Sequence, residues 1–267
     1  MNICFIGGGN MAGAMIGGLL NRGFDPDQLC AVEIDAASRE RLRDQHNISV
    51  FEDLAAVQSC DLVVLAIKPQ QLREVAVHLK SLLSEQIVLS IAAGIRLGDL
   101  ARWLGGASLV RAMPNTPALV GAGMTGLFGA NLTPLQREQV ETVVQAIGAF
   151  VWVDDETDLD AVTAVSGSGP AYFFYFIEAL EQAGCELGLP EATARQLAIE
   201  TALGAARLIH DGDEAPAALR ARVTSKNGTT ERALFSMESS RVKLHIVTAI
   251  KAAADRAKEL GDELGML

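Results

Sequence analysis

Residues 2–13 decide the fold: Asn2-Ile3-Cys4-Phe5-Ile6-Gly7-Gly8-Gly9-Asn10-Met11-Ala12-Gly13. The first five are apolar enough to form a buried strand, and Met15, Ile16, Leu19 and Leu20 follow with helical spacing. A G-x-G-x-x-A turn between a strand and a helix is typical of sites where a dinucleotide pyrophosphate lies at the helix N-terminus. Residues 7–12 are therefore the first candidate site.

Each position of this turn has a separate physical task. Gly7 permits the tight turn, Gly9 lets the backbone approach the phosphates, and Ala12 keeps the helix close to the strand. Exposed N–H groups and the positive end of the helix dipole would then hold the anion. Glycine turns also serve plain strand–helix connections, so the motif alone leaves that simpler interpretation open.

Strands alternate with helices over the first 158 residues. Further strands are expected at 28–34, 61–67, 87–94, 109–113, 124–128 and 150–153. Helices are expected at 36–44, 72–83 and after residue 133, where Thr133 is the cap and Pro134 the first position. This order predicts an α/β protein with a Rossmann-like, doubly wound parallel sheet.

The character of the sequence changes at about Asp158. Strand-like runs vanish there, and helical periodicity continues nearly to Leu267. We therefore expect two domains, a dinucleotide-binding domain over 1–158 and an all-helical domain over 159–267.

Composition and charge narrow the classes of function. Hydrophobic residues make up 49% of the chain and aromatic residues only 5%, as in parallel sheets covered by helices. The net charge of −11, with no cluster of Lys and Arg, disfavours nucleic-acid and anionic-membrane binding. No apolar run is long enough to span a membrane, and a strand beginning at residue 2 leaves no room for a signal peptide. A cytoplasmic protein is expected.

Cysteine and histidine spacing predicts no metal site. Cys4, Cys30, Cys60 and Cys185 are scattered, without a C-x-x-C pair. The four histidines are isolated from one another and from the cysteines. We interpret the cysteines as small buried residues of a protein in a reducing compartment.

Small and polar residues lie where three predicted strands end. The segments are Ala66-Ile67-Lys68-Pro69-Gln70, Ala92-Ala93-Gly94 and Pro114-Asn115-Thr116-Pro117. Ligands of doubly wound sheets lie beyond the carboxyl ends of the strands. The alanines leave space for a ribose and nicotinamide, Lys68 supplies a donor, and Pro69 turns the chain out of regular structure. Each segment alone is an ordinary turn, but three at one edge favour a cofactor cleft.

Glu33 bears on the choice of cofactor. It follows Ala12 by 21 residues, near the usual place of the acid that binds a ribose 2′-hydroxyl. A carboxylate would oppose a 2′-phosphate, since two like charges at about 4 Å cost on the order of 4 kcal/mol at an effective dielectric of 20. Nearby Arg39, Arg41 and Arg43 return about 1 kcal/mol or less as exposed ion pairs. These residues favour NADH, unless Glu33 turns away from the ribose.

Two glycine-rich segments interrupt the helical region, at 166–170 and 223–230. Both suit a helix start, and for each that explanation is sufficient. The second, however, concentrates neutral donors at a helix N-terminus beside Lys226, which suits a carboxylate. The donors are Ser225, Gly228, Thr229 and Thr230.

On these motifs the chain resembles the pyrroline-5-carboxylate reductases, which reduce a cyclic imine to proline. The resemblance spans essentially all 267 residues. The motifs that carry it, in order, are residues 5–12, 66–70, 92–94, 111–117 (Arg-Ala-Met-Pro-Asn-Thr-Pro), 166–172 (Ser-Gly-Ser-Gly-Pro-Ala-Tyr) and 223–230. The glycine turn is generic, whereas the last three together are specific to that family.

The resemblance implies roles for these residues. Gly7, Gly8, Gly9, Asn10, Met11 and Ala12 would hold the pyrophosphate of NADPH or NADH. Ala66, Lys68, Pro69, Ala92, Ala93 and Asn115 would lie at the ribose and nicotinamide. The turn formed by Ser225, Asn227, Gly228, Thr229 and Thr230 would hold the substrate carboxylate. Thr230 would be the catalytic residue, near the ring nitrogen, and residues 159–267 would form the substrate-binding and dimerisation domain of a homo-oligomer.

Three departures from the family pattern matter. Asn227 stands where the family usually has glycine, and Lys226 where proline is common, so the turn and its anion affinity can differ. Glu33-Ile34-Asp35 lacks the short polar or basic residues of members that prefer NADPH. The cofactor preference therefore stays open.

The expected reaction is hydride transfer from NAD(P)H to the C=N carbon. An imine is readily protonated, so such an enzyme needs positioning more than a strong acid, which fits the lack of His in these motifs. A β-hydroxyacid dehydrogenase is one alternative, but it needs a Lys on the long helix, and none occurs between Lys80 and Lys226. A non-catalytic dinucleotide sensor is another, but it would not need a second anion site.

Overall fold

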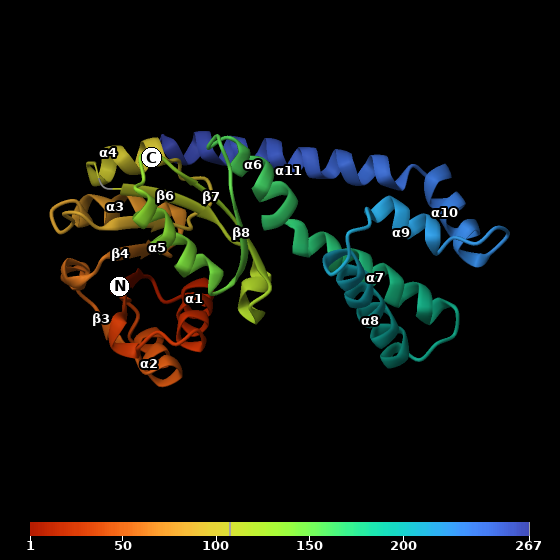
Figure 1. The fold of residues 1–267 in the computed structure, drawn as a ribbon, viewed down its shortest axis with the longest axis horizontal. Helices are drawn as coiled ribbons and strands as arrows, with labels where there is room; N and C mark the ends of the chain where they lie inside the picture. Colours follow the sequence, from red (N-terminus) through yellow and green to blue (C-terminus); the bar gives the residue numbers. More distant parts are fainter. Residues whose placement is uncertain (107, 267) are drawn as a thin grey trace. The chain divides into compact units, whose positions relative to one another are not determined.

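The computed structural model describes residues 1–106 and 108–266, which form two compact units. Unit 1 comprises Met1–Ser168 and Ala253–Leu267, and unit 2 comprises Gly169–Ala252. Figure 1 shows the sheet-containing unit 1 and the helical unit 2 along the coloured chain. The sequence predicted a dinucleotide-binding domain over 1–158 and a helical domain over 159–267. This assignment of functions stays a prediction.

Unit 1 is built on one eight-stranded sheet with the order β3-β2-β1-β4-β5-β6-β7-β8. All neighbouring strands are parallel except β6 and β7, which are antiparallel. The strands are β1 Ile3–Ile6, β2 Leu29–Val32, β3 Ser49–Phe51, β4 Leu62–Leu65, β5 Ile87–Ser90, β6 Ser108–Met113, β7 Gly123–Gly129 and β8 Gly148–Trp152. The doubly wound, Rossmann-like sheet predicted from the sequence is confirmed.

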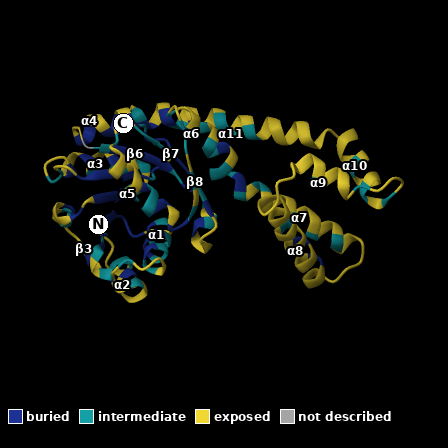
Figure 2. Ribbon diagram, in the orientation of Figure 1, coloured by how far each residue is buried: buried dark blue, intermediate teal, exposed yellow. Residues whose placement is uncertain are grey.

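Helices cover both faces of this sheet, and two hydrophobic clusters lie beneath them (Figure 2). One cluster holds buried side chains of α1 (Asn10–Asn21) and α5 (Pro134–Gln145), and the other those of α3 (Pro69–Leu79) and α4 (Leu97–Leu104). The remaining helical segments of unit 1 are α2 Ala36–His46, α6 Asp158–Val162, and the 3-10 turns η1 Pro26–Gln28, η2 Leu54–Ser59 and η3 Thr116–Val120. Strands β1, β4 and β5 are buried along their whole length, as expected of central parallel strands.

The helix start predicted at Thr133 is confirmed in detail. The Thr133 side chain accepts a hydrogen bond from the Gln136 N–H, and the Gln136 side chain accepts one from the Thr133 N–H. This reciprocal pair is a capping box, and Pro134 occupies the first helical position. Two other elements, β3 and α4, were not expected from the sequence.

The sequence predicted that residues 166–170 interrupt the helical region, and the structure differs there. A π-helical turn, η4 (Thr163–Gly167), lies between α6 and α7 (Gly169–Glu186). The Ser168 N–H donates to the Thr163 carbonyl oxygen at 2.8 Å. A wide turn of this kind is the common way to fit an extra residue into a helix, and it often marks functional sites.

Helix α11 (Val242–Gly265) begins in unit 2, and its last turns belong to unit 1. Leu264 joins the core cluster on the α3–α4 face. Arg96 pairs with Asp262 at 2.8 Å. Gly94 has a φ of +75°, and a Cβ there would lie 2.8 Å from Leu264 Cδ1, so glycine lets the two segments approach.

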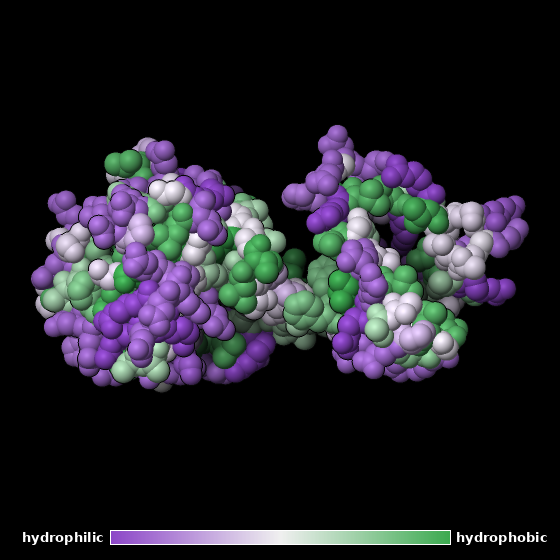
Figure 3. All heavy atoms as spheres, turned by 90° about the horizontal axis from the view of Figure 1, so that it is seen from below, coloured by the Kyte–Doolittle hydropathy of each residue, from purple (hydrophilic) through white to green (hydrophobic). Residues whose placement is uncertain are grey.

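Unit 2 is helical throughout its described elements. Besides α7 and the start of α11, it contains α8 Glu191–His210, α9 Pro216–Arg222 and α10 Thr229–Ser239. Helices α7 and α8 pack closely, since a Cβ at Gly184 would lie 2.8 Å from Ala194 Cβ. Most of unit 2 is nevertheless coloured as exposed in Figure 2, and Figure 3 shows hydrophobic residues on its surface. Large exposed apolar side chains on α7 include Phe173, Phe174, Tyr175 and Phe176. Among the described helices, none combines the length and the hydropathy needed to cross a bilayer.

Candidate functional site

The glycine turn after β1 has the tight geometry expected of it. Gly7 has a φ of +100°, and its N–H donates to the Val32 carbonyl oxygen at 2.8 Å. A Cβ at Gly7 would lie 2.6 Å from the Ala66 carbonyl oxygen. Both the positive φ and this close approach of β4 exclude any other residue here.

The start of α1 is open to a ligand. Gly9 is the N-cap residue, and no side chain caps the helix. A Cβ at Gly9 would meet no atom within 4 Å, so the space beside it is free. Ala12 is fully buried against the sheet, as the motif requires. Uncapped N–H groups, the helix dipole and free space together suit a pyrophosphate.

Glu33 follows β2 directly, and two backbone donors hold its carboxylate. Oε2 accepts from the Gly8 N–H at 2.7 Å, and Oε1 accepts from the Asp35 N–H at 2.9 Å. This places the carboxylate against the glycine turn, which is where a ribose 2′-hydroxyl would need it. Asp35 in turn caps α2 by accepting from the Ser38 N–H, and that bond lowers the pKa of Asp35.

Two arginines of α2 lie beside the same turn. Arg41 donates to the Gly8 carbonyl oxygen at 3.1 Å. Arg39 donates to the carbonyl oxygens of Glu33 and Ile34 at 2.9 and 2.7 Å, and it pairs with Glu52 at 3.1 Å. The neighbourhood of Glu33 therefore holds cations as well as an anion.

The predicted strand-end residues come together at one edge of the sheet. Ala66 continues β4 beside the glycine turn, since its N–H donates to the Ile6 carbonyl oxygen at 2.9 Å. Lys68 is the exposed N-cap of α3, and Pro69 is its first residue. After β5, Ala92 is buried and Ala93 is exposed. Because β1, β4 and β5 are adjacent and parallel, all these residues lie beyond carboxyl ends, where ligands bind.

Asn115 has a structural task that sequence reasoning missed. Its Nδ2 donates to the carbonyl oxygen and the hydroxyl of Ser166 at 3.1 and 3.2 Å, and its Oδ1 accepts from the Met124 N–H at 2.9 Å. The side chain thereby ties the end of β6 to β7 and to the π-helical turn. Its predicted contact with the cofactor stays a prediction.

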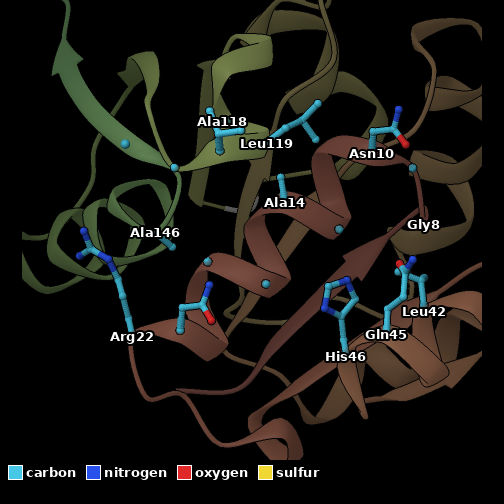
Figure 4. A pocket seen from close by; sticks show the side chains of 18 of the residues that line it. Gly8, Asn10, Ala14, Arg22, Leu42, Gln45, His46, Ala118, Leu119 and Ala146 are labelled. Atoms are coloured by element: carbon cyan, nitrogen blue, oxygen red, sulfur yellow. The ribbon is translucent and has the colours of Figure 1, made fainter.

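A groove of about 750 Å³ runs from Gly8 and Gly9 along α1, as Figure 4 shows. Arg41 and His46 of α2 line it on one side, and Leu119 of η3 on the other. Burial lowers the pKa of His46 and thus favours the neutral imidazole. Sequence reasoning missed this groove, since it depends on how α2 and η3 flank α1.

In unit 2, the turn before α10 presents the predicted substrate residues. Asn227 has a φ of +59°, and the Gly228 N–H donates to the Ser225 carbonyl oxygen at 3.1 Å. Thr229 and Thr230 are the first two residues of α10, whose N-cap Gly228 offers no side chain. The Glu231 carboxylate accepts a hydrogen bond from the Asn227 N–H, within the turn, at 2.8 Å. The turn is exposed, apart from half-buried Gly228 and Thr230.

The interpretation of the cysteines as buried residues is confirmed for Cys4 and Cys60 and is wrong for Cys185, which is exposed. Although scattered in sequence, three of the cysteines lie close together in the fold. The sulfur atoms of Cys4, Cys30 and Cys60 lie within 4.8 Å of one another. The register of β1 and β2 places Cys4 beside Cys30, and Cys60 lies between η2 and β4.

Two parts of the sequence match family models. Residues 156–260 match a family described as pyrroline-5-carboxylate reductase dimerisation. Residues 2–94 match one described as NADP oxidoreductase, coenzyme F420-dependent. The first match covers most of the helical C-terminal region, and the second covers the N-terminal half of the sheet-containing region.

Relatives match the chain over its full length. A pyrroline-5-carboxylate reductase of Pseudomonas aeruginosa is 45% identical over 267 residues, covering 98% of each chain. A solved pyrroline-5-carboxylate reductase from Coxiella burnetii has a TM-score of 0.93 at 40% identity, covering 97% of this chain and 98% of that one. Plasmodium falciparum pyrroline carboxylate reductase, solved with NADP bound, has a TM-score of 0.87 at 27% identity over 98% of each chain. On this full-length similarity in sequence and fold, the chain belongs to the pyrroline-5-carboxylate reductase family.

Proposed function

We propose that this protein reduces 1-pyrroline-5-carboxylate to L-proline, the last step of proline biosynthesis. The observation that carries the proposal is the 45% identity, over essentially the whole chain, to a relative of that name. In the reaction the C=N bond becomes a C–N single bond. Its carbon gains a hydride, its nitrogen gains a proton, and NADPH or NADH becomes NADP⁺ or NAD⁺.

The cofactor fits the open edge of unit 1. The uncapped start of α1 and the free space beside Gly9 suit the pyrophosphate, with Gly7, Gly8, Asn10, Met11 and Ala12 completing the cradle. When bound there, NAD(P)H supplies the hydride. Ala66, Lys68, Pro69, Ala92, Ala93 and Asn115 lie at the strand ends assigned to its ribose and nicotinamide. Glu33 faces the 2′ position of the adenosine ribose.

The turn before α10 is assigned to the substrate. Ser225 and Thr229 hold the carboxylate through neutral donors at a helix N-terminus, and Gly228 shapes the turn between them, since its N–H donates to the Ser225 carbonyl oxygen. Asn227 supplies the left-handed residue that shapes this turn. The Thr230 hydroxyl hydrogen-bonds the ring nitrogen and keeps the imine carbon in line for hydride transfer, because alignment lowers the barrier by several kcal/mol.

Unit 2 fits assembly into a homo-oligomer. Residues 156–260 match a dimerisation family, and α7 exposes a run of aromatic side chains. An apolar surface of this kind is expected to be covered by another chain. We assign residues 159–267 to substrate binding and dimerisation, and the assembled enzyme to the cytoplasm, without nucleic-acid or membrane partners.

One assay tests the function against its alternatives. Oxidation of NADPH and of NADH is followed by absorbance with 1-pyrroline-5-carboxylate, with a β-keto acid, or without substrate. We expect turnover only with the imine. Turnover with the β-keto acid would instead assign a β-hydroxyacid dehydrogenase, and cofactor binding without any turnover would assign a dinucleotide sensor.

A further inference from the structure

Three cysteines from different parts of the chain meet on one face of the unit 1 sheet. Cys4 of β1 and Cys30 of β2 are direct neighbours in the parallel register, so their side chains point to the same face. Cys60 follows η2, just before β4, which pairs with β1 on its other side. All three sulfur atoms lie within 4.8 Å of one another, and Cys30 Sγ and Cys60 Sγ are 3.8 Å apart.

We propose that Cys4, Cys30 and Cys60 form a binding site for one thiophilic d10 metal ion, Zn²⁺ or Cu⁺. Thiolates are the ligands that such ions prefer. An ion at about 2.3 Å from each of three sulfurs in one plane sets the sulfurs about 4.0 Å apart. The observed spacing, at most 4.8 Å, therefore needs the sulfurs to move relative to one another by less than about 1 Å.

The surroundings of the three sulfur atoms suit a largely buried metal site beside a surface hollow. Cys4 is fully buried and Cys60 nearly so, while Cys30 is half-buried. A surface hollow of about 410 Å³ is lined by Cys60 and its neighbours Ser59 and Asp61, which gives an ion a way in. Among the described residues no histidine or carboxylate joins the three sulfurs, so water would be a fourth ligand for Zn²⁺, and three sulfurs suffice for Cu⁺.

Metal binding at this site is an exchange of protons for the ion. Each thiol loses its proton to solvent as its sulfur–metal bond forms, and no electron is transferred.

The site is separate from the proposed catalytic edge. Cys4 precedes Gly7 by three residues, or about 10 Å of extended strand. Cys60 lies before β4 begins, whereas the predicted nicotinamide residues follow its end. Substitutions of these cysteines should therefore leave reduction of the imine unchanged, which provides a check that the variants are folded.

The test uses reduced, chelator-treated full-length protein under anaerobic conditions. It is mixed with one equivalent of Zn²⁺ or of Cu⁺ and desalted, and the metal retained per chain is measured. Cys30→Ser and Cys60→Ser are compared with Cys185→Ser, a control on exposed α7. We expect one ion per chain in the wild type and in the control. We expect the other two to retain no metal after desalting, because loss of a ligand weakens binding by more than the about 10–100-fold that partners outside the ligand set contribute.

The two metal ions are tested separately, and two cysteine variants are used in case one of them does not fold. Retention of Zn²⁺, of Cu⁺ or of both supports the site and identifies the ion it holds. If Cys30→Ser does not fold, Cys60→Ser, at the rim of the hollow, decides alone. The proposal is overturned if the wild type retains neither ion, or if Cys60→Ser retains as much as Cys185→Ser.

Discussion

At the residue scale, we expect Glu33 to set the balance between the two nicotinamide cofactors. Its carboxylate accepts a hydrogen bond from the Gly8 N–H at 2.7 Å, which holds it against the glycine turn, where we expect the ribose to lie. Glu33→Gln removes the charge and keeps an acceptor for Gly8. We expect the ratio of kcat/KM for NADPH to that for NADH to rise by more than about tenfold, since two like charges a few ångströms apart repel by more than 1.4 kcal/mol.

Glu52→Gln is the matched control for that change. It removes the same charge from a side chain that pairs with Arg39 but does not contact the glycine turn. An equal shift in both variants would mean that overall charge, rather than Glu33, decides the preference.

Thr230 is the residue on which the proposed chemistry depends most. Thr230→Ala removes one hydrogen bond to the imine nitrogen, worth about 1 kcal/mol, so kcat/KM for the imine should fall about five- to tenfold. Thr230→Ser keeps the hydroxyl and should retain most of the activity. Both variants should bind NADPH like the wild type in a fluorescence titration. Unchanged imine kinetics in Thr230→Ala would remove the residue from the mechanism.

Sequence patterns predicted local geometry well and spatial neighbours poorly. Asn227, noted as a departure from glycine, has a φ of +59°, which Asn tolerates better than most residues. The three clustered cysteines and the bonds of Asn115 were missed, because neither periodicity nor spacing reports which side chains meet across strands. Such contacts depend on register, which only the folded sheet fixes.

At the scale of elements, the capping box of α5 makes a measurable contribution to unit 1. Thr133→Ala leaves the Gln136 N–H without its acceptor and should lower the free energy of unfolding by about 1 kcal/mol. Trp152 is a suitable probe in denaturant titrations, because its Nε1 donates to Glu141 of α5 at 2.7 Å. Thr133→Ser preserves the cap and should unfold like the wild type. Equal stability of Thr133→Ala would show that solvent replaces the cap at no cost.

Elements with strong end signals or long apolar runs were predictable, and short ones were not. The strands at β1, β4 and β5 are continuous apolar runs, and α5 carries its own cap and proline. β3 is only three residues long, with one buried side chain, so it has almost no periodicity to detect. The π-helical turn before α7 was taken for a break, because Ser and Gly are equally common where helices start.

At the scale of the whole molecule, the apolar surface of α7 should govern assembly. Phe174 is 65% exposed, and burying such a side chain contributes about 1.5–3 kcal/mol. Phe174→Lys also places a charge there, so the dissociation constant of the homo-oligomer should rise by at least about 100-fold. Sedimentation equilibrium measures this change directly.

Leu135→Lys is the control for the assembly prediction. Leu135 is similarly exposed, at 64%, but lies on α5 of unit 1. It should leave the mass of the assembly unchanged. Dissociation by both substitutions, or by neither, would argue against a specific α7 interface.

The path of α11 has a consequence for how the chain acquires its structure during synthesis. Leu264 completes a cluster whose other members all lie before residue 110. A ribosome must therefore translate beyond residue 264, through all of unit 2, before the first half can complete its own core. Until then the β5–α4 corner stays open to solvent, so a nascent chain stalled within unit 2 should remain vulnerable to proteases there.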